Sequence, residues 1–176
     1  NIAACIIEPI AGSTGTLVPP KGYLKRIREI CDKHGILLIF DEVITGWGRT
    51  GSAFAAQEWK VTPDIMTMAK ATTNGVVPMG VVAVKEEIYD SVLDASSAPE
   101  GTPELFHGYT YSGIPVAVAA ALAVQDIFDK EDIFKRAKEM SPYLQDGLQS
   151  LKDLKDVVSI RGYGMMGGIE MKMKDK

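Results

Sequence analysis

The chain has 176 residues, which is long enough for one domain with a hydrophobic core. Hydrophobic residues make up 46% and charged residues 24%, ordinary values for a globular protein, and no apolar run approaches membrane-spanning length. The net charge of −4 argues against a general nucleic-acid binder, because such a protein carries a basic surface.

Strands and helices alternate in the first half of the chain. Apolar runs of strand length occupy residues 2–8, 36–40, 64–69 and 80–84, and the nearly continuous run of residues 2–8 is of the kind buried on both faces of a parallel sheet. Pro19 and Pro20 open a helix over about residues 20–34, and Gly35 ends it. This alternation predicts an α/β domain with a mostly parallel sheet.

The second half of the chain changes character. Helices are expected over about residues 86–93, 115–128 and 131–151, and a polar loop over residues 94–113. Pro142 should kink or interrupt the last of these helices. Residues 157–161 and 167–173 alternate like antiparallel strands. We therefore predict one domain within residues 1–130 and the start of a smaller α+β domain in residues 131–176.

The two ends and the two cysteines indicate the chain's context. The chain begins with Asn1-Ile2-Ala3, as if inside a strand, and stops directly after another strand-like stretch, so we expect a fragment of a longer chain. Cys5 and Cys31 fall within apolar patterns and lack CxxC spacing, which predicts buried, reduced thiols in a cytoplasmic protein.

Three polar residues stand at or just beyond the ends of buried strands: Glu8, Asp41 and Lys70. Open α/β sheets place ligand sites at this edge. A lysine there can form a Schiff base with a carbonyl, and a buried acid can hold a proton on a pyridine nitrogen, the two needs of pyridoxal phosphate. Taken singly, each residue is also compatible with an ordinary solvated turn or strand exit.

Other ligand sites find little support in the sequence. The Gly-rich loops at residues 12–15 and 46–51 match neither a P-loop nor a dinucleotide fingerprint, which disfavours a nucleotide-binding domain. His34 suits a helix end, and His107 is too isolated to build a metal site, so no metal is expected.

Four motifs that follow one another along the chain favour the pyridoxal-phosphate interpretation of these residues over the ordinary one. EPIAGSTG (8–15), LLIFDEVITGWGRTG (37–51), PDIMTMAKATTNGVVPMG (63–80) and HGYTYSG (107–113) together closely resemble the class III aminotransferases, which are fold-type-I pyridoxal-phosphate enzymes. The resemblance covers essentially the whole chain. It implies part of the cofactor-binding large domain, followed by the start of the small C-terminal α+β domain.

The resemblance also assigns roles to individual residues. Lys70 would form the Schiff base with pyridoxal 5'-phosphate and then move a proton on the substrate. Asp41 would pair with the pyridine nitrogen, Val43 would pack against the ring, and Glu8 would lie on the substrate side. Thr110 would contact the cofactor phosphate of the neighbouring subunit, which implies a homodimer.

Within the family, TNGVVPMG and HGYTYSG favour the ω-amino acid:pyruvate branch, so a small amine and a keto acid such as pyruvate are the expected partners. The sequence departs from the family pattern at Ile114, usually His or Asn, and at Ala71 and Thr72, usually Gly and Leu. The family's phosphate loop and carboxylate-binding arginine lie outside these residues, so we expect the piece alone to be inactive. The alternatives are an aminomutase or decarboxylase on the same cofactor, or a non-catalytic folded α/β fragment.

Overall fold

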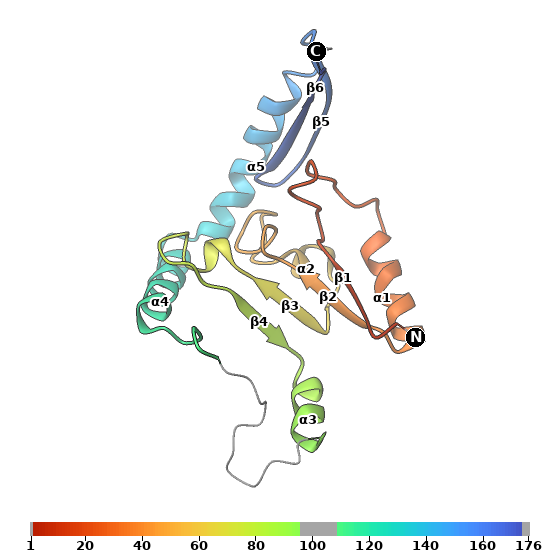
Figure 1. Cartoon of the computed structure of the whole chain (residues 1–176). Coiled ribbons are helices and arrows are strands. Elements are labelled where there is room, and N and C mark those ends of the chain that lie inside the picture. Colours follow the sequence, from red (N-terminus) through yellow and green to blue (C-terminus); the bar gives the residue numbers. More distant parts are fainter. Residues whose placement is uncertain (1, 96–108, 174–176) are drawn as a thin grey trace.

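A four-stranded sheet forms the centre of the computed structural model, which describes residues 2–95 and 109–173 (Figure 1). Its order is β1 (Ala4–Ile7), β2 (Leu37–Asp41), β3 (Ile65–Met68) and β4 (Val81–Val84). The first three strands are parallel and β4 is antiparallel to β3. The segment between β3 and β4 contains only a single 3₁₀ turn, η1 (Lys70–Thr72), and no crossover helix, so the chain returns antiparallel. The predicted α/β class with a mostly parallel sheet is confirmed.

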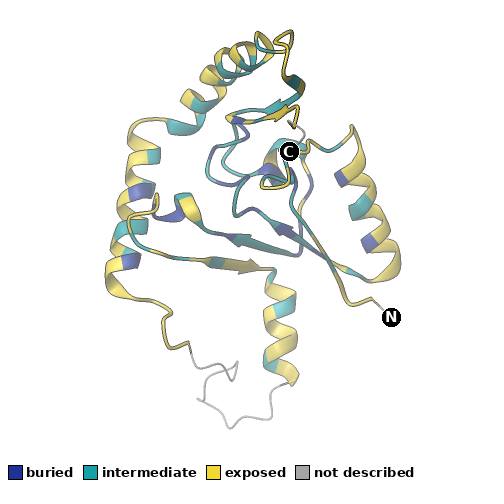
Figure 2. Ribbon diagram, turned by 45° about the horizontal axis from the view of Figure 1, so that its top comes forward, coloured by how far each residue is buried: buried dark blue, intermediate teal, exposed yellow. Residues whose placement is uncertain are grey.

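One face of the sheet carries the core. Helix α1 (Tyr23–His34) and the short helix α2 (Ala55–Trp59) pack there against β1 and β2. The fully buried members of the cluster are Leu24, Cys31, Leu38, Phe40 and Val61. Figure 2 shows this buried band between α1 and the central strands. The start of α1 lies later than predicted, because Gly22 adopts a left-handed conformation just before it.

The opposite face of the sheet is open, which corrects the prediction of strands buried on both faces. Ile6 and Val82 lie on this face and are 61% and 64% exposed. Ile6 pairs with Ile39, Ile39 pairs with Ile65, and Ile65 pairs with Val84, so a row of apolar side chains crosses the sheet. A parallel sheet is normally covered on both sides. The continuous apolar run of β1 therefore indicates that the face carrying Ile6 is suited to burial, although residues 2–95 and 109–173 leave it uncovered.

The rest of the chain is helical and ends in a hairpin. Helix α3 (Glu86–Ala95) extends from the end of β4, and α4 (Pro115–Lys130) leads into α5 (Ile133–Gln149). Strands β5 (Val157–Tyr163) and β6 (Met166–Met171) form a separate antiparallel sheet beside α5. Pro142 does not interrupt the helix, because α5 continues on both sides of it. The alternative, a kink at Pro142, stays a prediction. The predicted domain division after residue 130 stays a prediction.

An ionic junction ties α1 to three strands. Asp64, just before β3, accepts hydrogen bonds from the Leu38 N–H and from Arg28, both at 2.7 Å, and forms an ion pair with Lys85 at 2.7 Å. Burial by itself would raise the pKa of Asp64, but the hydrogen bonds from Lys85, Leu38 and Arg28 and the charge of Arg28 lower it to about 2. The junction is therefore ionised at neutral pH.

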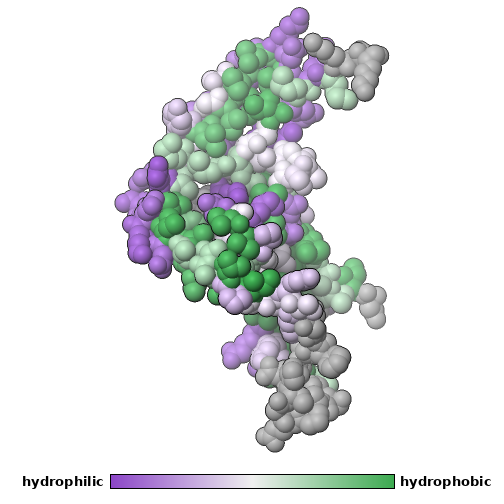
Figure 3. All heavy atoms as spheres, turned by 60° about the vertical axis from the view of Figure 1, so that its left-hand side comes forward, coloured by the Kyte–Doolittle hydropathy of each residue, from purple (hydrophilic) through white to green (hydrophobic). Residues whose placement is uncertain are grey.

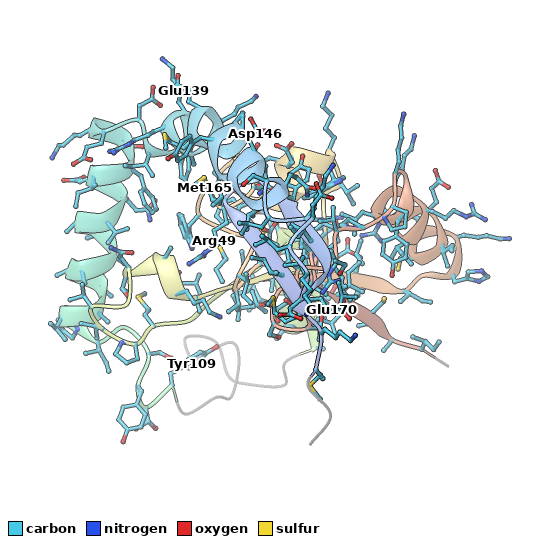
Figure 4. All side chains as sticks on the ribbon, turned by 90° about the horizontal axis from the view of Figure 1, so that it is seen from above. Arg49, Tyr109, Glu139, Asp146, Met165 and Glu170 are labelled. Atoms are coloured by element: carbon cyan, nitrogen blue, oxygen red, sulfur yellow. The ribbon has the colours of Figure 1, made fainter. Side chains whose placement is uncertain are left out.

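Besides its contacts with α5, the β5–β6 hairpin forms hydrogen bonds with residues of the first half of the chain. The Arg161 guanidinium donates to the Gly15 carbonyl at 2.7 Å. The Met165 N–H donates to the Arg49 carbonyl at 2.7 Å, and Figure 4 shows these two residues together beneath α5. The Tyr163 hydroxyl donates to the Glu58 carboxylate at 2.5 Å. The hairpin is thus hydrogen-bonded to the loops that follow β1 and β2 and to helix α2.

The cysteines match their prediction in part. Both are free, but Cys31 is buried while Cys5 is only half-buried, because β1 lies at the edge of the sheet. Burial raises the pKa of the Cys31 thiol. The cytoplasmic location inferred from them stays a prediction. Of the helices formed by residues 2–95 and 109–173, none has the length and apolar character needed to cross a membrane.

Candidate active site

Three of the predicted site residues meet at one edge of the sheet. Asp41 is the last residue of β2, Glu8 follows β1 directly, and Lys70 is the second residue after β3. Because Ile7 pairs with Phe40 and Asp41 pairs with Thr67, the three parallel strands end at the same level. The structure therefore brings an acid, an acid and a lysine to the carboxyl edge, where open sheets bind ligands.

Asp41 is half-buried, and one oxygen of its carboxylate is engaged. Oδ1 accepts the backbone N–H of Val43 at 2.9 Å, which folds residues 41–43 into a tight turn. No hydrogen bond to Oδ2 is found within the part of the chain that the structure describes. That oxygen can accept a hydrogen bond from a protonated ring nitrogen, as the role expected of Asp41 requires.

Glu8 closes the loop that follows β1. Its Oε2 accepts the backbone N–H of Gly12 at 3.0 Å. Gly12 in turn lies against Ile44, since a Cβ on Gly12 would come within 2.7 Å of the Ile44 Cδ1. The loops after β1 and β2 therefore pack directly on each other, which holds Glu8 beside the segment that carries Asp41.

Lys70 begins the 3₁₀ turn η1 and is exposed. Its backbone has a φ of 48°, a left-handed conformation that residues other than glycine rarely adopt. The turn is held by the Thr72 N–H, which donates to the Ala69 carbonyl at 3.1 Å, and by the Gly75 N–H, which donates to the Lys70 carbonyl at 3.2 Å. Over residues 2–95 and 109–173, no hydrogen bond or ion pair engages the Lys70 amine, so it can reach a ligand.

Thr110 is not assembled with the other three residues. Thr110 lies just before the start of α4. The end of α4 that approaches the loop after β2 is the other one, where Phe128 contacts the Trp47 ring. A helix of 16 residues is about 24 Å long. Figure 4 shows the neighbouring Tyr109 well apart from Arg49. His107 and Gly108, which begin the motif that contains Thr110, lie outside the described residues.

Glu42 is a structural residue that the sequence reasoning passed over. It is fully buried, and its carboxylate accepts the Thr45 hydroxyl at 2.7 Å and the N–H groups of Ala55 and Ala56 at 2.8 and 2.7 Å. Burial raises its pKa, and these hydrogen bonds oppose that rise. The period of two that starts at Leu38 and Phe40 places Glu42 on the buried face, and this signal could have found it.

Arg49 serves the loop that contains it. Its guanidinium is half-buried and donates to the carbonyls of Ile44 and Gly46 at 3.0 and 3.4 Å, and burial lowers its pKa. No carboxylate pairs with it in the described part of the chain. Nor do residues 2–95 and 109–173 bring together three or more His, Cys, Asp or Glu side chains that could hold a metal ion.

Comparisons with known proteins agree with this arrangement. The family model for aminotransferase class-III matches residues 1–176. An omega-aminotransferase of Caulobacter vibrioides is 56% identical over 171 residues, and an omega-amino acid–pyruvate aminotransferase of Pseudomonas putida is 50% identical over 175 residues. These alignments cover 97% and 99% of this chain but 38% and 39% of the relatives, so the chain spans about two fifths of their length.

A solved structure shows the same fold. The (S)-enantioselective omega-transaminase of Thermomicrobium roseum superposes with a TM-score of 0.88 at 43% identity, over 96% of this chain and 36% of that one. The motifs, the fold and the family match therefore agree along the whole length of these residues, and the chain belongs to the class III aminotransferase family.

Proposed function

We propose that the complete protein containing these residues moves an amino group from an amine or ω-amino acid to pyruvate, with pyridoxal 5'-phosphate as cofactor and Lys70 as the lysine that carries it. The observation that supports this most strongly is the meeting of Lys70 and Asp41 at one sheet edge, with the Lys70 amine and the Asp41 Oδ2 both open to a ligand.

The chain's residues divide the work between them. When bound, the cofactor supplies an aldehyde that condenses with amines and a pyridine ring that withdraws electrons. Lys70 Nζ would hold the cofactor and would move a proton to and from the substrate carbon as a general base and acid. The Asp41 carboxylate would hold the proton on the ring nitrogen, and Val43 would pack against the ring. Glu8 would lie on the substrate side.

The choice of substrates comes from the relatives. The Pseudomonas putida relative is named for an ω-amino acid and pyruvate, and the Thermomicrobium roseum structure for an omega-transaminase. We therefore assign the same pair of substrate classes to this protein. The amino group would be taken from the donor in one half-reaction and given to pyruvate in the other, a ping-pong sequence.

Product analysis tests the proposal. The complete protein is loaded with pyridoxal phosphate, β-alanine and pyruvate are added, and the alanine formed is measured. Alanine that depends on both substrates, and is lost in Lys70→Ala, supports the proposal. A product that forms without pyruvate would indicate an aminomutase or a decarboxylase instead. Residues 1–176 alone should give no turnover.

A homodimer belongs to the same proposal. Apolar side chains are exposed along α4 and the segment before it, including Tyr111 at 85% and Leu122 at 63%, and Figure 3 shows the side of the molecule on which α4 lies. Exposed apolar surface of this kind favours association. Thr110 lies in the same region and would contact the cofactor phosphate held by the partner. Light scattering on the complete protein tests the dimer, and Thr110→Ala should weaken cofactor binding without changing the mass.

A further inference from the structure

We propose that Trp47 is a positioning residue for Lys70 and acts through the hydroxyl of Thr72. The proposal rests on the role of Lys70 given above. It adds a side chain outside the sheet edge that sets the position of the Lys70 side chain. Thr72 is one of the positions at which this chain departs from the pattern of the family it resembles.

The contact is a short relay of hydrogen bonds. The Trp47 indole Nε1 donates to the Thr72 Oγ1 at 3.0 Å. The Thr72 hydroxyl donates in turn to the Ala69 carbonyl at 3.1 Å, and the Thr72 N–H donates to that same carbonyl at 3.1 Å. The Ala69 carbonyl belongs to the peptide group that precedes Lys70. These hydrogen bonds therefore fix the orientation of the Ala69–Lys70 peptide plane.

Lys70 needs such support because its own conformation is unfavourable. Its left-handed φ of 48° brings the Cβ close to the backbone, and the exposed side chain is held by no other group in residues 2–95 and 109–173. Four methylene groups separate the backbone from the amine. A small rotation of the Ala69–Lys70 peptide would therefore be magnified at Nζ, away from the edge that carries Asp41.

Trp47 is rigid enough to provide that support. Its backbone N–H donates to the Ala53 carbonyl at 2.6 Å, and its ring contacts Phe54 and Phe128 with centroid distances of 4.9 and 5.9 Å. Thr72 is only 3% exposed, so water cannot easily replace the indole as donor to its hydroxyl. The aromatic cluster thus fixes Trp47, and Trp47 fixes the turn that carries the lysine.

The test separates the hydrogen bond from ring packing. Trp47→Phe keeps an aromatic ring and removes the N–H, and Thr72→Val removes the hydroxyl at nearly constant shape, whereas Thr72→Ser keeps the hydroxyl. Trp59→Phe is the matched control, because the Trp59 ring contacts Tyr163 with a centroid distance of 5.0 Å and its indole N–H makes no hydrogen bond within the described residues. All variants are made in the complete protein.

Two measurements apply to each variant. The first is amide hydrogen exchange over residues 69–75 in the cofactor-free protein. The second is the rate at which Lys70 is labelled by pyridoxal phosphate and borohydride, read by peptide mass spectrometry. Where the protein transaminates, kcat and the KM for the donor are measured as well.

We expect Trp47→Phe and Thr72→Val to speed exchange and to slow labelling roughly two- to tenfold, as the loss of one buried hydrogen bond implies. The kcat should fall with little change in KM, and the double variant should be no worse than either single one. Thr72→Ser and Trp59→Phe should resemble the parent.

Equal effects of Trp47→Phe and Trp59→Phe, or additive losses in the double variant, would overturn the proposal. Exchange and labelling that respond as expected in a protein unable to transaminate would refute the proposed function and leave the positioning intact.

Discussion

Replacing Asp64 by Asn removes the negative charge at the junction of α1, β2, β3 and β4. Arg28, Lys85 and the Leu38 N–H all approach this carboxylate at 2.7 Å, and only 9% of the side chain is exposed. The fall of its pKa from 3.8 to about 2 corresponds to about 2 kcal/mol of native-state stabilisation at neutral pH. Leaving Arg28 without this buried partner adds to the cost, so we expect a loss of about 2–4 kcal/mol.

The pH dependence makes this prediction specific. The pKa is lower in the folded state, so the contribution is complete above pH 3.8 and is lost as the pH falls towards 2. The free energy of unfolding is measured by urea titration for the complete cofactor-free parent and for Asp64→Asn, and the two values are subtracted. The part of this difference that comes from ionisation should be constant from about pH 7 to 5 and fall to roughly half by pH 3. Other carboxyl groups titrate alike in both proteins and cancel.

Asp32→Asn is the matched control. Asp32 pairs with the same arginine at 2.7 Å, but 64% of its side chain is exposed, so its removal should cost less than about 1 kcal/mol. A parent-minus-variant difference for Asp64→Asn that stays constant down to pH 3, or that equals the loss in Asp32→Asn, would refute the reasoning that a buried ionised carboxylate joins these elements.

Three further predictions concern the packing around the site. Glu42→Gln should lower the free energy of unfolding in urea by about 2 kcal/mol, because three donors bind the two carboxylate oxygens and the amide NH₂ that replaces one oxygen cannot accept a hydrogen bond. A variant as stable as the parent would contradict this assignment. Tyr163→Phe should lower the free energy of unfolding by about 1.5 kcal/mol, since its hydroxyl donates to the charged Glu58. The loss should be the same at pH 7 and 9, because burial and the bond to Glu58 raise the pKa of Tyr163 to about 12 and keep it protonated; a loss that disappears by pH 9 would argue against the bond. Gly164→Ala should destabilise the protein far more than Gly35→Ala in thermal melts, because both glycines have a positive φ but only a Cβ on Gly164 would clash with the loop after β2; equal effects would show that the hairpin does not pack on that loop.

The position of the site could be predicted from the sequence because it depends on where strands end. Glu8, Asp41 and Lys70 each follow an apolar run of strand length, and parallel pairing then brings the ends of such strands to one edge. The positions of Asp41 and Lys70 at this edge could be predicted without knowing any contact between residues distant in sequence.

Elements that depend on contacts distant in sequence could not be predicted. Helix α2 has five residues, too few for a periodic pattern, and Glu42, 13 residues before Ala55, accepts its first N–H groups. The Trp47–Thr72 hydrogen bond joins residues 25 apart. The apolar run of β1 predicted burial on both faces, but in the structure only the face that carries Cys5 and Ile7 packs against the core, and Ile6 is 61% exposed.

Cofactor trapping on the complete protein tests the central claim most directly. The protein is mixed with pyridoxal phosphate, reduced with borohydride and digested, and the modified lysine is identified by mass spectrometry, with Lys70→Arg as control. Labelling confined to Lys70 and absent from the control is the predicted result. Labelling spread over several lysines, or unchanged in Lys70→Arg, would contradict the assignment of Lys70 and with it the proposed function.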